Sequence, residues 1–227
     1  MEQDVKVLLD QISTTLIDLK AKVDSMTSDA PTFIDNEFFE LNSKDTFVKL
    51  KANAFGINKV QFSFVKFDVN TKKLTSSMDA YLDMEDALLF ANDILSGKIA
   101  KLAEIEKTKG AKYPGKVWES SMGGVHEQKA AQRGRTDGKA ISRMFTLSPG
   151  MSQPFIFTAE QRPGTTNDRG LIVPEYSAKP EVQIRVPATA ESIKKMALAI
   201  QSHITAYRAA QYANGAYNVD PAKRTTN

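Results

Sequence analysis

The sequence predicts an α+β protein built from two sheet-and-helix units, each with four strands followed by one helix (ββββα twice), and preceded by an amphipathic helix. Three observations lead to this prediction. Residues 4–27 have the apolar spacing of a coiled coil. Two later regions, 37–82 and 116–187, contain stretches that alternate between apolar and polar side chains as strands do, and each region is followed by a segment of helical periodicity. One irregular α+β domain is the alternative interpretation of the same order.

The first predicted element is a helix over residues 4–27. Its apolar residues are separated alternately by four and three positions, which is the coiled-coil period of about 3.5 residues. They are Val5, Leu9, Ile12, Leu16, Leu19, Val23 and Met26. A helix this short is marginally stable alone in water, so its apolar stripe needs a partner. We expect residues 1–28 to be an oligomerisation helix; packing of the stripe on its own domain is the alternative.

The first set of strands follows a break in the pattern. Residues 29–36 contain Pro31 and are expected to form a linker. Asp83 is expected to cap a helix that begins at Met84 and continues toward a break at residues 107–110. Alternation predicts the strands before it over residues 38–41, 46–54, 59–69 and 74–82.

The second set of elements repeats this order. Thr189 is expected to cap a helix that extends to about Ala210, and the polar residues 211–227 are expected to be a flexible tail. The strands are predicted over residues 116–122, 140–147, 154–160 and 181–187. The predicted body therefore covers residues 37–210, with halves of about 37–110 and 111–210.

Composition and charge exclude several classes of protein. The chain has 227 residues, a hydrophobic share of 41% typical of a globular protein, and a net charge of only +3. It has no cysteine, which excludes disulfides, thiolate catalysis and cysteine-based zinc sites. No apolar run approaches the roughly 20 residues that a membrane helix needs. We expect a soluble, cytoplasmic protein that does not associate with a membrane and binds neither a metal nor a cofactor.

Catalytic motifs are incomplete. Residues 110–117 nearly match a phosphate-binding P-loop, but Val117 stands where a serine or threonine would hold magnesium, and a strand is predicted to follow instead of a helix. The two histidines, His126 and His203, lie far apart and have no partner at metal-ligand spacing. We therefore expect a protein with no catalytic residues, which is not an enzyme.

A cluster of cations in the second half is the clearest chemical signal. Residues 129–143 hold five cations against one acid, Asp137, and the glycines among them predict a mobile loop. Single-stranded nucleic acids are bound by cations that follow the phosphates and by flat side chains that stack on bases. The binding residues expected here are Trp118, Lys129, Arg133, Arg135, Lys139 and Arg143. A solvated surface loop and a core position for Trp118 are the alternatives.

The first half carries a weaker signal of the same kind. Lys49, Lys51 and Lys66 have phenylalanine neighbours and are expected to contribute to a cationic face of the first sheet. Phe62 and Phe64 are expected to lie in the core. Residues 161–170, rich in Gly, Pro, Thr and Asn, are expected to form a loop.

Four strands and a helix, occurring twice within residues 37–210, resemble the Whirly and positive-cofactor-four group of single-stranded nucleic-acid-binding proteins, which includes Whirly-like proteins of phages and mobile elements. The resemblance rests on the order of elements. It implies two sheets that project from a helical core and strands that hold unpaired DNA. The Lys-Gly-Asn-Lys-Ala-like motif of plant Whirly proteins does not occur here, so the resemblance implies no individual binding residue.

These observations lead to one expected function and one rival. We expect a non-enzymatic, sequence-tolerant single-stranded DNA-binding protein that forms homo-oligomers, with RNA or duplex DNA as the other ligands of the same basic segment. A phage or mobile-element product of this kind would act in the bacterial host cytoplasm. The rival is a structural or assembly protein, for example of a phage particle, that uses the N-terminal helix for subunit contacts.

Overall fold

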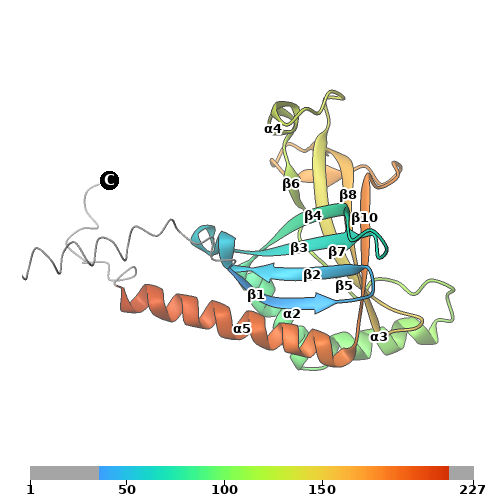
Figure 1. Cartoon of the computed structure of the whole chain (residues 1–227), viewed down its shortest axis with the longest axis vertical. Coiled ribbons are helices and arrows are strands. Elements are labelled where there is room, and N and C mark those ends of the chain that lie inside the picture. The colour runs from blue at the N-terminus through green and yellow to red at the C-terminus, as the bar shows by residue number, and fades with distance from the viewer. Residues whose placement is uncertain (1–35, 215–227) are drawn as a thin grey trace, which may run out of the picture. The chain divides into compact units, whose positions relative to one another are not determined.

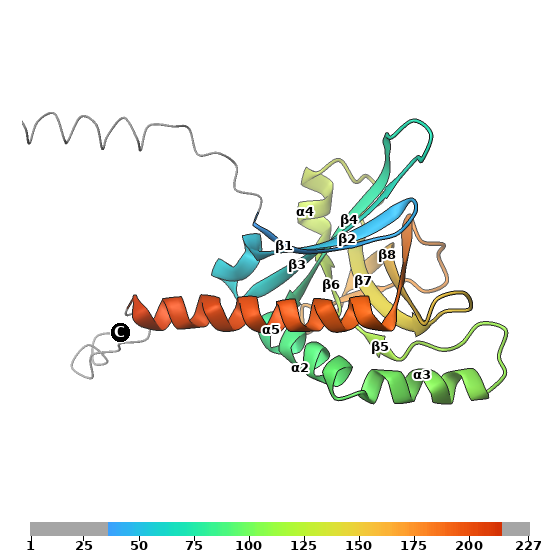
Figure 2. The same cartoon turned by 60° about the horizontal axis from the view of Figure 1, so that its bottom comes forward.

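The protein is described by a computed structural model over residues 36–214. These residues form an α+β fold with two β-sheets whose strands cross, with α2, α3 and α5 along one side and α4 at the opposite end (Figures 1 and 2). The α+β class and the presence of two sheets are thus confirmed. The helix predicted over residues 1–28, all but the last residue of the linker predicted over 29–36, and residues 215–227 of the tail predicted over 211–227 lie outside the described residues.

The first sheet is an antiparallel meander in the order β1-β2-β3-β4. Its strands are β1 (Glu37–Asn42), β2 (Thr46–Lys51), β3 (Lys59–Phe67) and β4 (Leu74–Asp83). The strand predicted over residues 46–54 ends early, because the short 3-10 helix η1 (Ala52–Ile57) buries Ala54 and Phe55 in its place. Alternate residues such as Val60, Phe62 and Phe64 are fully buried, so one face of this sheet belongs to the core.

Two helices follow the first sheet where the sequence predicts one. They are α2 (Met84–Leu95) and α3 (Lys98–Thr108), and α2 begins at the predicted residue. The predicted cap is not formed, because the Asp83 side chain makes no capping hydrogen bond and pairs with Lys59 instead. The break falls at Gly97, which has a φ of 79°, a left-handed conformation that glycine adopts without strain. The apolar residues of α2 and α3 share one periodic pattern, which hides the break in the sequence.

The second sheet has the order β10-β8-β7-β5, with β6 paired to β7 and β9 paired to β8. Its strands are β5 (Trp118–Glu119), β6 (Gly123–Val125), β7 (Ala140–Pro149), β8 (Phe155–Thr166), β9 (Ile172–Pro174) and β10 (Val182–Ala188). The strand predicted over residues 116–122 is interrupted, because the Ser120 side chain accepts the Phe145 backbone N–H at 3.0 Å in place of a strand neighbour. Pairing with β7 resumes at β6.

Two predicted loops are partly regular structure. The segment 129–143 begins in the helix α4 (Glu127–Gln132) and ends in β7, so it is a loop only in its middle. β8 continues to Thr166 through the segment predicted as a loop over residues 161–170. Gly164 suits this strand because a Cβ atom there would lie 2.7 Å from the Val173 carbonyl oxygen of β9. A close strand neighbour, and not a turn, requires that glycine.

The last helix, α5 (Ala190–Ala213), is the longest that the structure describes within residues 36–214. The predicted cap is confirmed: Thr189 and Ser192 form a capping box, in which the Thr189 Oγ1 accepts the Ser192 N–H at 3.0 Å. The helix runs three residues beyond the predicted end and packs beside α2, with Ile193, Met196 and Ile200 buried. No helix of the described residues is long and apolar enough to span a membrane.

An aromatic cluster joins the two sheets into one core. The Phe145 ring of β7 lies 4.7 Å from Phe62 and 5.3 Å from Phe64, both on β3, measured between ring centroids. Phe157 of β8 and Phe90 of α2 extend the cluster. The core positions predicted for Phe62 and Phe64 are therefore confirmed. This packing also brings the edge strand β4 against β6 and β7 of the second sheet.

We expect Phe145→Ala to lower the free energy of unfolding by about 3–5 kcal/mol, because it removes the ring at the centre of this cluster and leaves a cavity. Met151→Ala is the control, since Met151 is 85% exposed and its loss should change the free energy by less than about 0.5 kcal/mol. Urea unfolding followed by circular dichroism measures both. Similar small effects for the two variants would contradict a single core shared by the sheets.

Candidate nucleic-acid interface

A cleft opens where β4 of the first sheet faces the second sheet. Its volume is about 810 Å³, within the range of sites that hold small ligands. One wall consists of Lys59 and the outward-facing residues Asp79, Tyr81 and Asp83. The other wall is formed by the β6 region, α4 and β7. We call this space the inter-sheet cleft. It brings together three of the residues predicted to bind nucleic acid, namely Lys129, Arg133 and Arg143.

The helix α4 places two of these cations at the cleft. Lys129 lies in α4, and Arg133 is the first residue after it; both side chains are exposed. The buried Ala130 fixes one side of the helix to the second sheet. The Glu127 carboxylate fixes its start, because it accepts the Thr166 backbone N–H at 2.8 Å and the Thr166 hydroxyl at 2.7 Å. These hydrogen bonds lower the pKa of Glu127.

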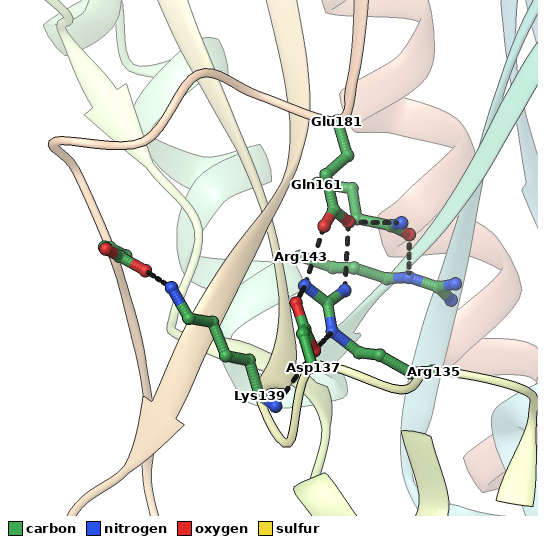
Figure 3. A network of polar contacts seen from close by, with 7 residues as sticks. Arg135, Asp137, Lys139, Arg143, Gln161 and Glu181 are labelled. Atoms are coloured by element: carbon green, nitrogen blue, oxygen red, sulfur yellow. Dashed lines mark hydrogen bonds and ion pairs between the residues drawn. The ribbon is translucent and has the colours of Figure 1, made fainter. Parts of the chain in front are cut away.

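The third cation of the cleft is Arg143 on β7. Its Nε donates a hydrogen bond to the Gln161 Oε1 of β8 at 3.0 Å, across the register pair that these two residues form (Figure 3). Within residues 36–214, its two terminal guanidinium nitrogens make no hydrogen bond or ion pair. Lys129 and Arg133 likewise take part in none of the ion pairs of the described region. All three positive charges are therefore available to an anion in the cleft.

Tyr81 supplies a flat aromatic surface among these cations. The residue is 44% exposed and lines the cleft. Burial raises the pKa of the Tyr81 phenol, and the negative charge of Asp79 adds to the rise, while the positive charges of Arg143 and Arg133 oppose it. The phenol is therefore within electrostatic reach of both guanidinium groups. The arrangement combines an exposed ring with neighbouring cations, the two components of single-strand binding sites.

The acidic residues of the cleft leave it with a net positive charge. Its charged lining consists of four cations, Lys59, Lys129, Arg133 and Arg143, and two carboxylates, Asp79 and Asp83. Lys59 and Asp83 neutralise each other, with 2.6 Å between Nζ and Oδ1. Three cations and the Asp79 carboxylate remain, so the cleft as a whole attracts anions.

Arg135 lies on the predicted basic segment but is held by acids. Its Nε lies 2.6 Å from Asp137 Oδ1, and its Nη2 lies 2.8 Å from Oε1 of Glu181, the residue before β10 (Figure 3). These hydrogen bonds raise the pKa of Arg135 and lower the pKa of both carboxylates. The side chain is only 13% exposed. In the structure Arg135 anchors the segment that follows α4 and is not presented to a ligand.

Two of the predicted lysines are also paired with acids. The Lys139 Nζ lies 2.5 Å from Glu175 Oε2. Lys49 lies 2.8 Å from both Glu37 and Glu40 on β1, and its hydrogen bonds to them raise its pKa. Because each ammonium already has a carboxylate partner, neither adds an unbalanced positive charge to the surface.

The predicted cationic face of the first sheet does not include Lys66. Strand register places Lys49 and Lys51 opposite Ser63 and Gln61, whose side chains point away from the core. Lys66 pairs with the buried Thr46 and therefore lies on the other face of the sheet, at the end of β3. The three lysines alternate with apolar neighbours, but they lie on two different strands. The register between those strands determines which face of the sheet each lysine side chain occupies.

Trp118 packs on the core, which was the alternative to its predicted role in binding nucleic acid. Its indole ring lies 4.1 Å from Phe90 and 5.3 Å from Phe145, measured between ring centroids, and it is partly buried. It therefore packs on the aromatic cluster instead of offering a free face. Tyr81, which the sequence analysis did not select, is the aromatic residue of the cleft. Its signal was the alternation of β4, where Asp79 and Tyr81 oppose the buried Met78, Ala80 and Leu82.

The described residues form no metal-binding site, since no group of three or more His, Asp or Glu side chains within 36–214 could hold a metal ion. His126 Nδ1 lies 3.1 Å from the Thr166 hydroxyl, and His203 stacks on Phe38 with 4.6 Å between ring centroids. Both histidines thus have local structural contacts.

No protein-family model matches the chain, and no curated protein matches it.

We expect Asp79→Asn to lower the pKa of Tyr81, because the substitution removes a negative charge that disfavours the tyrosinate. Arg133→Gln should raise it, because a positive charge that favours the tyrosinate is lost. Titration of ¹³C-labelled tyrosine by NMR measures both changes, and Asp45→Asn, at the residue before β2, is a control that changes the charge by the same amount. Shifts in the opposite directions would show that the Tyr81 phenol is not flanked by these groups.

We expect the Arg135 cluster to stabilise the fold above acidic pH. Arg135 lowers the pKa of Asp137 and Glu181 below their ordinary values of 3.8 and 4.5, so its stabilising effect is complete above those values and is lost as the pH falls through the folded-state pKa values. Arg135→Gln should therefore be less stable than the wild type at about pH 7 and more nearly equal to it at about pH 3. Urea unfolding at both pH values measures the difference, and an unchanged difference would exclude these ion pairs as its source.

Proposed function

We propose that the protein is a non-enzymatic, sequence-tolerant single-stranded DNA-binding protein, and that the strand binds in the inter-sheet cleft. One observation carries the proposal: Tyr81, which is partly exposed, lines a cleft whose opposite wall carries three cations without an acidic partner among residues 36–214. Lys129, Arg133 and Arg143 would contact phosphates, and Tyr81 would stack on a base. Base stacking on an aromatic side chain contributes about 1–3 kcal/mol per base and accepts any base.

The position of Tyr81 favours an unpaired strand over a duplex. Within a duplex the bases are stacked on one another and present only their edges, so an aromatic ring reaches a base face only where the base is unpaired or flipped out. Tyr81 lines one wall of the cleft and is faced by the other wall, so it does not lie on an open convex surface. RNA has the same phosphates and base faces, so it remains the competing ligand that the binding experiment must include.

The order of strands supports a Whirly-like architecture as part of this proposal. β1 to β4 form a meander that leads into α2, and β5, β7, β8 and β10 form a second meander that leads into α5. On this interpretation, the ββββα unit occurs twice, and β6, α4 and β9 are additions to the second unit. The proposal also retains the N-terminal oligomerisation helix over residues 1–28, which would join copies of the chain.

A structural or assembly protein is the second candidate. It is favoured by apolar side chains that the helices expose: Leu89 of α2 is 64% exposed and Leu198 of α5 is 55% exposed. Since α2 and α5 pack side by side, these residues would suit subunit contacts. This candidate gives no role to the cations around Tyr81, which is why we place it second.

The binding experiment uses the full chain and a fluorescently labelled oligo-dT of about 12 nucleotides, followed by anisotropy. We expect binding that weakens steeply between roughly 50 and 200 mM salt. Arg133→Gln and Arg143→Gln should each weaken binding and reduce the slope of log K against log salt by about 0.7, the value for one phosphate contact with a single strand. Unlabelled duplex DNA should compete poorly, and RNA is tested beside it.

Arg185→Gln is the matched control, because Arg185 is an exposed cation on the outward face of β10 and does not line the cleft. It should leave both the affinity and the salt slope close to those of the wild type. Absence of binding at low salt would exclude the proposed function. Equal losses from Arg185→Gln and Arg133→Gln would show that binding depends on overall charge and not on the cleft.

A further inference from the structure

The Asp79 carboxylate is out of place in a site made only for phosphates. It lines the same cleft as Arg133 and Arg143, and it is the one carboxylate of that lining, within the described residues, that has no cationic partner. Its Oδ1 accepts a hydrogen bond from the Ser63 hydroxyl at 2.6 Å. Its Oδ2 has no hydrogen-bond partner within residues 36–214. A phosphate placed against this oxygen would be repelled, so the group suits a ligand that donates hydrogen bonds.

The position of Asp79 relative to Tyr81 identifies which part of a nucleotide would reach it. The two residues are two positions apart on β4 and face the same side of the sheet, so their Cα atoms are roughly 6.6 Å apart. They pair with Ser63 and Gln61, respectively, on β3. A base stacked on the Tyr81 ring can therefore direct an edge toward Asp79, while its phosphates extend toward the cations of the opposite wall.

Guanine is the base whose edge matches a carboxylate best. Its Watson–Crick edge carries two adjacent donors, N1–H and the N2 amino group, which two carboxylate oxygens can accept together. Each carboxylate oxygen has two lone pairs, so Oδ1 can accept one of these bonds beside that from Ser63. Thymine offers only one donor there, and adenine and cytosine each offer one amino group beside an acceptor nitrogen that the carboxylate repels. An acceptor-only side chain therefore distinguishes guanine from the other three bases.

We propose that the inter-sheet cleft prefers guanine at one position, with the base stacked on Tyr81 and its Watson–Crick edge hydrogen-bonded to Asp79. This inference rests on the proposed single-strand binding and adds a base preference to it. Stacking and phosphate contacts would provide most of the affinity for any sequence. Asp79 would add a preference for guanine at one nucleotide position of the bound strand.

The test compares guanine with inosine, which lacks only the N2 amino group. Full-length protein is titrated with oligo-dT of about 12 nucleotides that carries a single central dG, dI or dT. We expect the dG strand to bind roughly tenfold more tightly than the dI strand, which corresponds to one hydrogen bond to a charged group. In Asp79→Asn the ratio should fall to about one, because the amide can place an N–H against the donor edge.

Asp83→Asn is the matched control. It makes the cleft more positive by the same one charge, so any general gain in phosphate affinity appears in both variants, but it should keep the preference for dG. The Ser63–Asp79 hydrogen bond could instead serve only to join β3 and β4; in that case Asp79→Asn would alter stability and leave the dG to dI ratio unchanged. Equal binding of dG and dI by the wild type would overturn the inference while leaving single-strand binding intact. No binding to any strand would overturn both proposals.

Discussion

The contact between the two sheets through Phe145 is the interaction on which the rest of the structure depends. Phe62 and Phe64 come from the first sheet, Phe145 and Phe157 from the second, and Phe90 from the helix between them. Because these rings interlock, the sheets cross instead of lying as separate layers (Figure 1). The edge strand β4 is thereby held against β6 and β7, and the inter-sheet cleft is a direct result.

The charges of the second half are arranged by the same packing. Glu127 fastens the start of α4 to Thr166, and Arg135 fastens the residues after α4 to Glu181. Between these two anchors, Lys129 and Arg133 remain without acidic partners in the described region. The five cations of residues 129–143 therefore have two different roles in the fold. Some of their side chains hold the segment in place, and the others face the cleft.

The sequence was sufficient for the elements that have a clear period and insufficient for those that do not. The strands of the first sheet follow alternation, and the start of α5 follows its capping box; both signals act over a few residues. β6 and β9 have three residues each, too few for a period to appear. Glu181, the second acid bound to Arg135, and Glu175, the partner of Lys139, lie 46 and 36 residues away, so local sequence patterns could not predict these two ion pairs. Tyr81 was visible as an outward residue of β4, but only the crossing of the sheets reveals what it faces.

The composite origin of the cleft has a consequence for fragments of the chain. Tyr81 and Asp79 belong to the stretch before α2, and Lys129, Arg133 and Arg143 to the stretch after α3. Neither stretch alone contains both walls, and each depends on the other for its share of the aromatic core. Truncation or proteolytic cleavage that separates the two sheets would therefore destroy the inter-sheet cleft. A ligand that contacts both walls would stabilise the intact protein against this separation.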